Sequence, residues 1–382
     1  MSNSPKGHFT GKERLEMFSH LGRPMRKGAP AELAISDYQR IQSAIEQKSP
    51  DAKTYLEILN TNSFGMVLLY TEWLLNWKPT LANHSTELDG PKIVEECYSR
   101  WTELTNTDED FKGKETTALF HQELHPSKYD SSSIGHFRTE LSQGLPALVQ
   151  RLTKRSASLY QELVSTLEAH DIQKSKALFD DLFKEILLVH DLCVELIALY
   201  PAMVLKATNQ QILNKIYTES FTQLLTYSGL WTLSMGMTPE EIAGFLAEHL
   251  RAHFSGSGRK GVTEVVEEAD RYRLIFEPCG SGGAVRRRSE KNQTSLDKLP
   301  NASPETWNRK GEVPGYCSHC AINELQSVKH FGFPVFVTEF QKDPNKPCGW
   351  TVYKDPNLIP EEYFTRLGIK KDPSLFKKLG KQ

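Results

Sequence analysis

The stretch Ser255-Gly256-Ser257-Gly258 marks the change that decides how this chain folds. Upstream of it, apolar residues recur at the three- and four-residue spacing of helices. Downstream, the apolar spacing changes to two, which is typical of strands. Runs of small residues are typical of linkers and hinges. We therefore predict an α+β protein with an N-terminal all-α helical bundle at residues 1–255, followed by a smaller α+β domain at residues 256–382.

The length and composition support two domains without disulfide bonds. The chain has 382 residues, of which 38% are hydrophobic, so each part can bury a core of its own. No apolar segment follows the initial Met-Ser-Asn-Ser-Pro, which predicts a cytoplasmic protein. The most apolar stretch, residues 186–205, contains His190, Asp191 and Glu195. These polar residues are costly in a bilayer, so we expect a buried helix and no membrane contact.

The periodicity predicts the individual elements. Helices are expected near residues 31–48, 52–77, 91–105, 136–168, 173–200, 208–235 and 239–254. Strands of a short antiparallel sheet are expected at 262–266, 271–277, 333–340 and 350–354, with helices at 321–330 and 360–366. Residues 280–313, which are rich in Gly, Ser, Asn and Pro, are expected to form a long loop.

Charge is distributed unequally along the chain. Residues 1–255 carry 25 basic and 32 acidic side chains, a net charge of −7, whereas residues 256–382 carry 21 and 16, a net charge of +5. This balance argues against general nucleic-acid binding. Ser281 in a glycine-rich segment and the run Arg286, Arg287 and Arg288 nevertheless suggest a loop that binds a small anionic substrate, although a merely flexible charged loop has the same composition.

Four of the six cysteines lie in the last quarter of the chain. Cys317 and Cys320 are separated by two residues, and Cys279 and Cys348 are each expected in a turn. Two thiols in one tight turn and two from distant segments match a tetrahedral Zn²⁺ site. We predict a four-cysteine zinc site in which His319 could replace a thiolate. A fully closed site of this kind is usually structural.

Other uses of these cysteines remain open. A Cys-x-x-Cys pair at the start of a helix is also typical of thiol redox proteins, because the helix dipole favours the reactive thiolate. That reading leaves Cys279 and Cys348 without a role. Unrelated buried thiols are a third possibility, and the spacing matches neither common ferredoxin pattern.

Three histidines are predicted to face the core of the bundle. His249 and His253 lie four residues apart on the apolar stripe of the helix at 239–254, and His190 lies on the apolar stripe of the helix at 173–200. Two imidazoles at this spacing can bind one metal ion, which suggests a possible second metal in the helical domain. A hydrogen-bonded core histidine is the simpler alternative, especially for His190.

These patterns favour a metal-dependent enzyme of hydrolase or lyase type. We expect it to act on a small anionic substrate, with the three histidines catalytic, the arginine loop binding substrate and zinc at the cysteines. The alternatives are a ligand- or partner-binding protein with a structural zinc, and a Cys-x-x-Cys redox protein. The sequence does not determine the substrate, the reaction or the oligomeric state.

Overall fold

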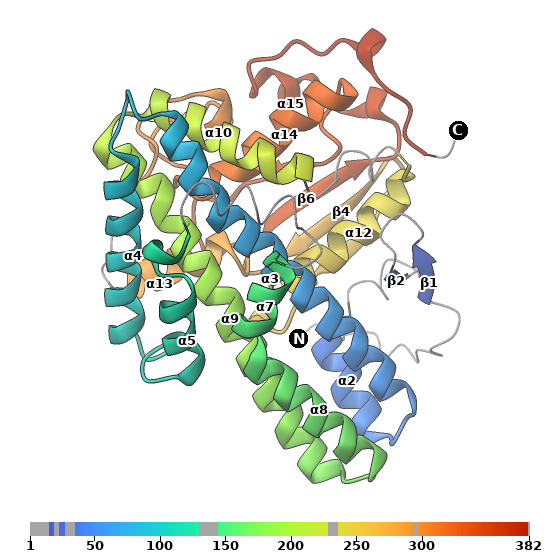
Figure 1. The fold of residues 1–382 in the computed structure, drawn as a ribbon. Helices are drawn as coiled ribbons and strands as arrows, with labels where there is room; N and C mark the ends of the chain where they lie inside the picture. The colour runs from blue at the N-terminus through green and yellow to red at the C-terminus, as the bar shows by residue number, and fades with distance from the viewer. Residues whose placement is uncertain are drawn as a thin grey trace. The chain divides into compact units, whose positions relative to one another are not determined.

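The computed structural model describes residues 35–129, 144–227, 236–292 and 297–380, together with the backbone of a short hairpin formed by β1 (Leu15–Phe18) and β2 (Arg23–Arg26). Within these residues the protein is mostly helical, with twelve α-helices and one four-stranded antiparallel sheet toward the C-terminus (Figure 1). The prediction of a helical protein with a small α+β region is confirmed at this level.

The chain divides into two compact units that are not consecutive in sequence. Unit 1 comprises residues 1–62, 229–283 and 324–382, and unit 2 comprises residues 63–228 and 284–323. The predicted boundary between residues 255 and 256 falls inside unit 1, and the division into two sequential domains stays a prediction. The predicted linker is hydrogen-bonded within unit 1, since the Gly256 amide donates to the Pro278 carbonyl at 2.9 Å.

Unit 2 is built around one long helix, α9 (Ile172–Ala207), which packs against four neighbours. These neighbours are α4 (Gly90–Thr107), α5 (Glu115–Glu123), α8 (Lys154–Glu168) and α10 (Gln210–Tyr227). A shorter helix, α7 (Gly144–Leu152), packs against α5 and α8. Most of α3 (Asp51–Asn83), most of α13 (Gly282–Lys291) and the start of α14 (Ser318–Phe331) also belong to this unit.

The helix α9 lies in the core because most of its side chains are apolar. Asp171 caps its first turn by accepting a hydrogen bond from the Lys174 amide, and most of its residues are buried. It is the one described helix that is long and apolar enough to cross a membrane, and 89% of its most apolar window is buried inside the protein. The prediction of a buried helix in this region is confirmed.

Unit 1 contains the sheet, in the order β3-β4-β6-β5. Its strands are β3 (Glu264–Glu267), β4 (Arg271–Phe276), β6 (Cys348–Tyr353) and β5 (Val337–Glu339). One helix, α12 (Pro239–Ala252), packs against β4 and β6 (Figure 1). It begins as predicted, because Thr238 and Glu241 form a capping box ahead of Pro239. The remaining helices of unit 1 are α2 (Asp37–Glu46) and α15 (Glu361–Thr365).

Several predicted elements were wrong. Residues 282–291, expected in a loop, form α13, whose N-terminal half, residues 282–286, is buried on all sides. The helix was not predicted because its glycine-rich start and its run of arginines show no apolar residues at helical spacing. Helix α5 was missed, and the region 136–168 contains two described helices, α7 and α8, while residues 136–143 lie outside the described part of the chain.

Candidate functional site

The four clustered cysteines are divided between the units. Cys279 and Cys348 belong to unit 1, whereas Cys317 and Cys320 belong to unit 2. Cys348 is the first residue of β6, paired with Phe276 of β4, so it does not lie in the predicted turn. Among the described residues, no group of three or more His, Cys, Asp or Glu side chains is arranged to hold a metal ion. The predicted four-cysteine zinc site is therefore not supported.

Cys320 instead forms a pair with the histidine that precedes it. The Cys320 Sγ lies 3.4 Å from Nε2 of His319, and Nδ1 of the same ring lies 2.6 Å from the Tyr316 carbonyl oxygen. A carbonyl can only accept, so Nδ1 carries the proton and Nε2 is left to accept the thiol S–H. The thiol therefore lies beside an unprotonated ring nitrogen whose orientation is fixed by a third group, which is the geometry of a thiol–imidazole pair.

This pair lies in an aromatic environment within unit 2. The His319 ring contacts Trp73, Phe221 and Tyr316 at centroid distances of 5.6, 5.7 and 4.9 Å. Burial among these rings lowers the pKa of His319 to about 4, because the charged imidazolium loses its solvation. The imidazole is therefore neutral near pH 7, and the resting pair is a neutral thiol donating to a neutral ring.

Both cysteines of the Cys-x-x-Cys motif lie near the same buried phenol. The Tyr217 hydroxyl donates to the Tyr316 carbonyl at 3.1 Å. Burial raises the pKa of Tyr217 well above its usual range, and the charges of Tyr316, Cys317 and Cys320 raise it further. Cys317 is buried while Cys320 is partly exposed, so solvent reaches the second thiol of the motif more readily.

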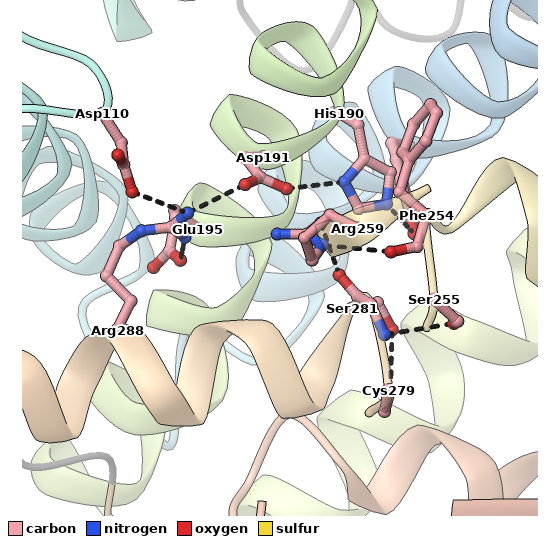
Figure 2. Close-up of polar contacts among 12 residues, drawn as sticks. Asp110, His190, Asp191, Glu195, Phe254, Ser255, Arg259, Cys279, Ser281 and Arg288 are labelled. Carbon is pink, nitrogen blue, oxygen red and sulfur yellow. Dashed lines mark hydrogen bonds and ion pairs between the residues drawn. The ribbon is translucent and has the colours of Figure 1, made fainter. Parts of the chain in front are cut away.

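A second polar cluster lies on α9. His190, which is 1% exposed, has its Nδ1 2.8 Å from Oδ1 of Asp191 (Figure 2). Its Nε2 is 3.5 Å from the Tyr70 hydroxyl. The prediction that His190 faces inward is confirmed. Its catalytic role stays a prediction, because the geometry also matches a core histidine that is held by its neighbours.

Arg288 of α13 joins this cluster. Its guanidinium is 2.8 Å from Asp191, forms a short ion pair with Glu195 and lies 3.7 Å from Asp110 (Figure 2). Asp108 also lies 3.7 Å from it. Although burial opposes it, the charges of Asp191 and Glu195 raise the pKa of Arg288. A guanidinium already surrounded by carboxylates is poorly placed to bind an anion. The predicted substrate-binding role of Arg288 therefore finds no support here.

The other two arginines of the run differ in exposure. Arg286 is buried and Arg287 is half-buried, and both have interactions within the protein. Their predicted role in binding substrate stays a prediction.

Burial also changes the titration of Glu195. Burial raises the pKa of Glu195 to about 7, although the neighbouring Arg288 opposes this rise. For Asp108, burial is outweighed by hydrogen bonds from Asn292 and from the Asp110 amide, which lower the pKa of Asp108. The cluster therefore contains one carboxyl that titrates near neutrality and one that stays ionised.

His249 and His253 contact one another in unit 1. Their Nε2 atoms lie 2.8 Å apart, so one ring donates and the other accepts. His253 is the C-cap of α12 and is 8% exposed, while His249 stacks against Trp350 at 6.1 Å. The predicted shared face is confirmed. Whether the pair binds metal or acts in catalysis stays a prediction.

The segment around Cys279 is anchored by backbone contacts. The Gly280 amide donates to Ser255 Oγ at 3.1 Å, and the Gly280 carbonyl accepts from the Arg259 guanidinium at 2.8 Å (Figure 2). Ser281 is 7% exposed, with its hydroxyl 4.0 Å from Cys279 Sγ. Its substrate-binding role stays a prediction.

Sequence reasoning missed the acidic partners of Arg288. Asp191 and Glu195 lie four residues apart in the mostly apolar second half of α9, so both project from one side of the helix. That spacing is visible in the sequence and indicates a buried cation opposite. Asp108 carries no comparable signal, because it follows the end of α4 in a polar segment.

Comparison of this chain with protein-family models, with curated proteins and with solved structures found no match.

Proposed function

We propose that this protein is an enzyme of thiol–disulfide exchange that uses Cys320 as the attacking thiol and Cys317 as the resolving thiol. The observation that carries the proposal is the placement of Cys320 Sγ 3.4 Å from the unprotonated Nε2 of His319. The orientation of that ring is set by its Nδ1–H, which donates to Tyr316.

The position of the motif supports the same chemistry. Cys317 immediately precedes α14 and Cys320 lies in its first turn, where backbone N–H groups favour a thiolate. In a disulfide-forming pair, the more accessible thiol makes the first attack. Cys320 is the partly exposed member of this pair and Cys317 the buried one.

The reaction is balanced in two steps. The Cys320 sulfur attacks one sulfur of a small disulfide substrate, and its proton passes to Nε2 of His319 as the new S–S bond forms. The leaving thiolate takes that proton and departs as a thiol, with Cys320 held in a mixed disulfide. Cys317 then attacks the Cys320 sulfur and releases the second half of the substrate as a thiol. The Cys317–Cys320 disulfide that remains is reduced by two molecules of a low-molecular-weight thiol, which supply the two electrons and leave as their own disulfide.

The proposal is tested by trapping the mixed disulfide. Reduced protein is incubated with glutathione disulfide, and peptide mass spectrometry locates the modified sulfurs. We expect a Cys317–Cys320 disulfide in the parent protein and a stable glutathione adduct on Cys320 in Cys317→Ser. Cys320→Ser should form neither. Cys348→Ser serves as the matched control and should behave as the parent.

The same preparation tests the metal-dependent alternative, in which zinc at the cysteines assists a reaction on an anionic substrate. Metal content and thiol reactivity are measured in protein purified without added metal. A stoichiometric metal whose removal by a chelator unmasks Cys317 and Cys320 would favour that alternative. Absence of the Cys320 adduct in Cys317→Ser would overturn the thiol-exchange proposal.

A further inference from the structure

The face of the sheet away from α12 carries a groove. Trp350 of β6 contacts His249 of α12, and alternate residues of a strand point to opposite faces, so Gly349 and Thr351 lie on the other face. A groove with a volume of about 580 Å³ opens there, within unit 1. Its lining includes Arg273 of β4, Gly349 and Thr351 of β6, Glu339 of β5 and Tyr363 of α15.

Gly349 leaves room at the floor of this groove. It pairs with Ile275 of β4 on one side and with Glu339 of β5 on the other. Apart from its chain neighbours, a Cβ on Gly349 would meet only two atoms of the described residues within 4 Å, the Leu274 carbonyl oxygen at 3.3 Å and the Glu339 Cβ at 3.8 Å. A glycine inside a strand weakens the sheet and often marks a position where a ligand approaches the backbone. The floor of the groove can therefore accept a ligand.

One side of the groove presents a cation. Arg271 is held by Asp270 at 2.9 Å and by Glu268 at 3.0 Å. Glu268 is therefore already shared when Arg273 contacts it at 3.3 Å. The Arg273 side chain is 45% exposed, and an exposed ion pair contributes little to stability. The Arg273 guanidinium can thus turn to a bound anion at small cost.

The opposite side of the groove presents a carboxylate. Glu339 accepts a hydrogen bond from the Tyr363 hydroxyl, which sets the orientation of the carboxylate. Glu339 and Arg273 lie on the strands that flank β6, offset by two residues along the sheet. With strands about 4.8 Å apart and a rise of about 3.4 Å per residue, their Cα atoms are roughly 12 Å apart. A molecule that bridges the two charges must be longer than one amino acid, whose ammonium and carboxylate share one carbon.

We propose that this groove binds a short peptide of about two residues in its zwitterionic form. The terminal carboxylate pairs with Arg273, the terminal ammonium pairs with Glu339, and the peptide backbone lies over Gly349. Two residues of extended chain span about 7 Å, which suits the separation of the two charged side chains. Hydrogen bonds between ionised partners are the strong ones, so the two termini supply most of the affinity. A ligand with one charge leaves either Arg273 or Glu339 without a counterpart.

Calorimetry with the full chain tests the proposal, with the dipeptide Ala-Ala as the probe. N-acetyl-Ala-Ala lacks the ammonium, and Ala-Ala-amide lacks the carboxylate. We expect Ala-Ala to bind the parent protein at least tenfold more tightly than either blocked peptide. Arg273→Gln should abolish the preference over the amide, and Glu339→Gln the preference over the acetylated peptide. A purely structural role of these residues would weaken the three peptides alike.

A third variant tests the floor of the groove. Gly349→Val places a side chain over the floor and should weaken Ala-Ala binding at least tenfold, with circular dichroism reporting that the sheet is intact. Glu267→Gln is the matched control for Glu339→Gln, because Glu267 pairs with Tyr272 on the opposite face of the sheet. It should leave Ala-Ala binding unchanged.

Two results would overturn the proposal. One is the absence of Ala-Ala binding to the parent protein, and the other is undiminished Ala-Ala binding in Arg273→Gln. The groove belongs to unit 1, whereas Cys317 and Cys320 belong to unit 2, so the proposal does not rest on thiol–disulfide exchange. Cys320→Ser is accordingly expected to bind Ala-Ala as the parent protein does.

Discussion

Gly280 lies so close to the backbone of His253 that a Cβ atom on Gly280 would be 1.9 Å from the His253 carbonyl oxygen. The Cβ would also lie 2.5 Å from the carbonyl carbon of Phe254. Only glycine fits at position 280, where the segment after Cys279 packs against the backbone at the end of α12. The glycine-rich stretch after Cys279 therefore has a packing role.

Gly280→Ala should be strongly destabilising, because backbone atoms on both sides must move apart. We expect a loss of about 3 kcal/mol or more in the free energy of unfolding, measured by urea denaturation. Gly244→Ala is the matched control, since a Cβ there meets no atom within 4 Å. In the interior of α12 that change should stabilise the protein by about 0.5–1 kcal/mol. Equal stabilities of the two variants would contradict this interpretation.

Arg288→Met should destabilise the protein, because two buried carboxylates would lose the cation that they share. Asp191 and Glu195 would lose their shared ion pair in a buried setting, so we expect unfolding to become easier by about 3–5 kcal/mol. Arg309→Ala, which breaks the exposed contact with Glu312, should cost less than about 1 kcal/mol. If Arg288→Met lowered the free energy of unfolding by less than about 1 kcal/mol, water would be solvating the carboxylates and the prediction would be wrong. Thermal and urea unfolding both report the difference.

Glu195 should make stability depend on pH near neutrality. Because burial raises the pKa of Glu195 from 4.5 to about 7, the folded protein binds its proton more tightly than the unfolded chain. Its contribution to stability is therefore present below pH 4.5 and is lost as the pH rises through 7. Glu195→Gln should remove a slope of up to about 1.4 kcal/mol per pH unit between these values. Glu162→Gln, at an exposed ion pair, should leave the slope unchanged.

His319 should produce the opposite slope. Burial lowers the pKa of His319 to about 4, so from about pH 6.5 downward the unfolded chain takes up a proton that the folded protein does not. Stability is therefore lost as the pH falls from 6.5 to 4, by no more than about 3 kcal/mol because the ring is not completely shielded. His319→Asn should flatten this part of the stability curve measured by urea unfolding.

The control for His319 is His170→Asn, at an exposed residue with φ of 58° that Asn adopts readily. The acid slope should persist in that variant. Its disappearance in both variants would show that the slope does not come from His319.

The sequence by itself determined the elements that depend on periodicity and capping. The apolar stripe of α9, the capping box of α12 and the hairpin of β3 and β4 all follow from local residue order. The inward positions of His190 and of the pair His249 and His253 follow from the same spacing. Local chemistry suffices for these features because their causes lie within a few turns of one helix or hairpin.

Only the tertiary structure decided which side chains meet. The sequence predicted one zinc site from Cys279, Cys317, Cys320 and Cys348. In the structure, the first and last of these belong to a different compact unit from the middle two. Arg288 suggested an anion site in the sequence, but its charge is satisfied by Asp191 and Glu195, which lie 97 and 93 residues away along the chain. Burial then sets the titration of Glu195 and His319. Ion pairing and desolvation depend on neighbours that are distant in sequence, so spacing along the chain could not reveal them.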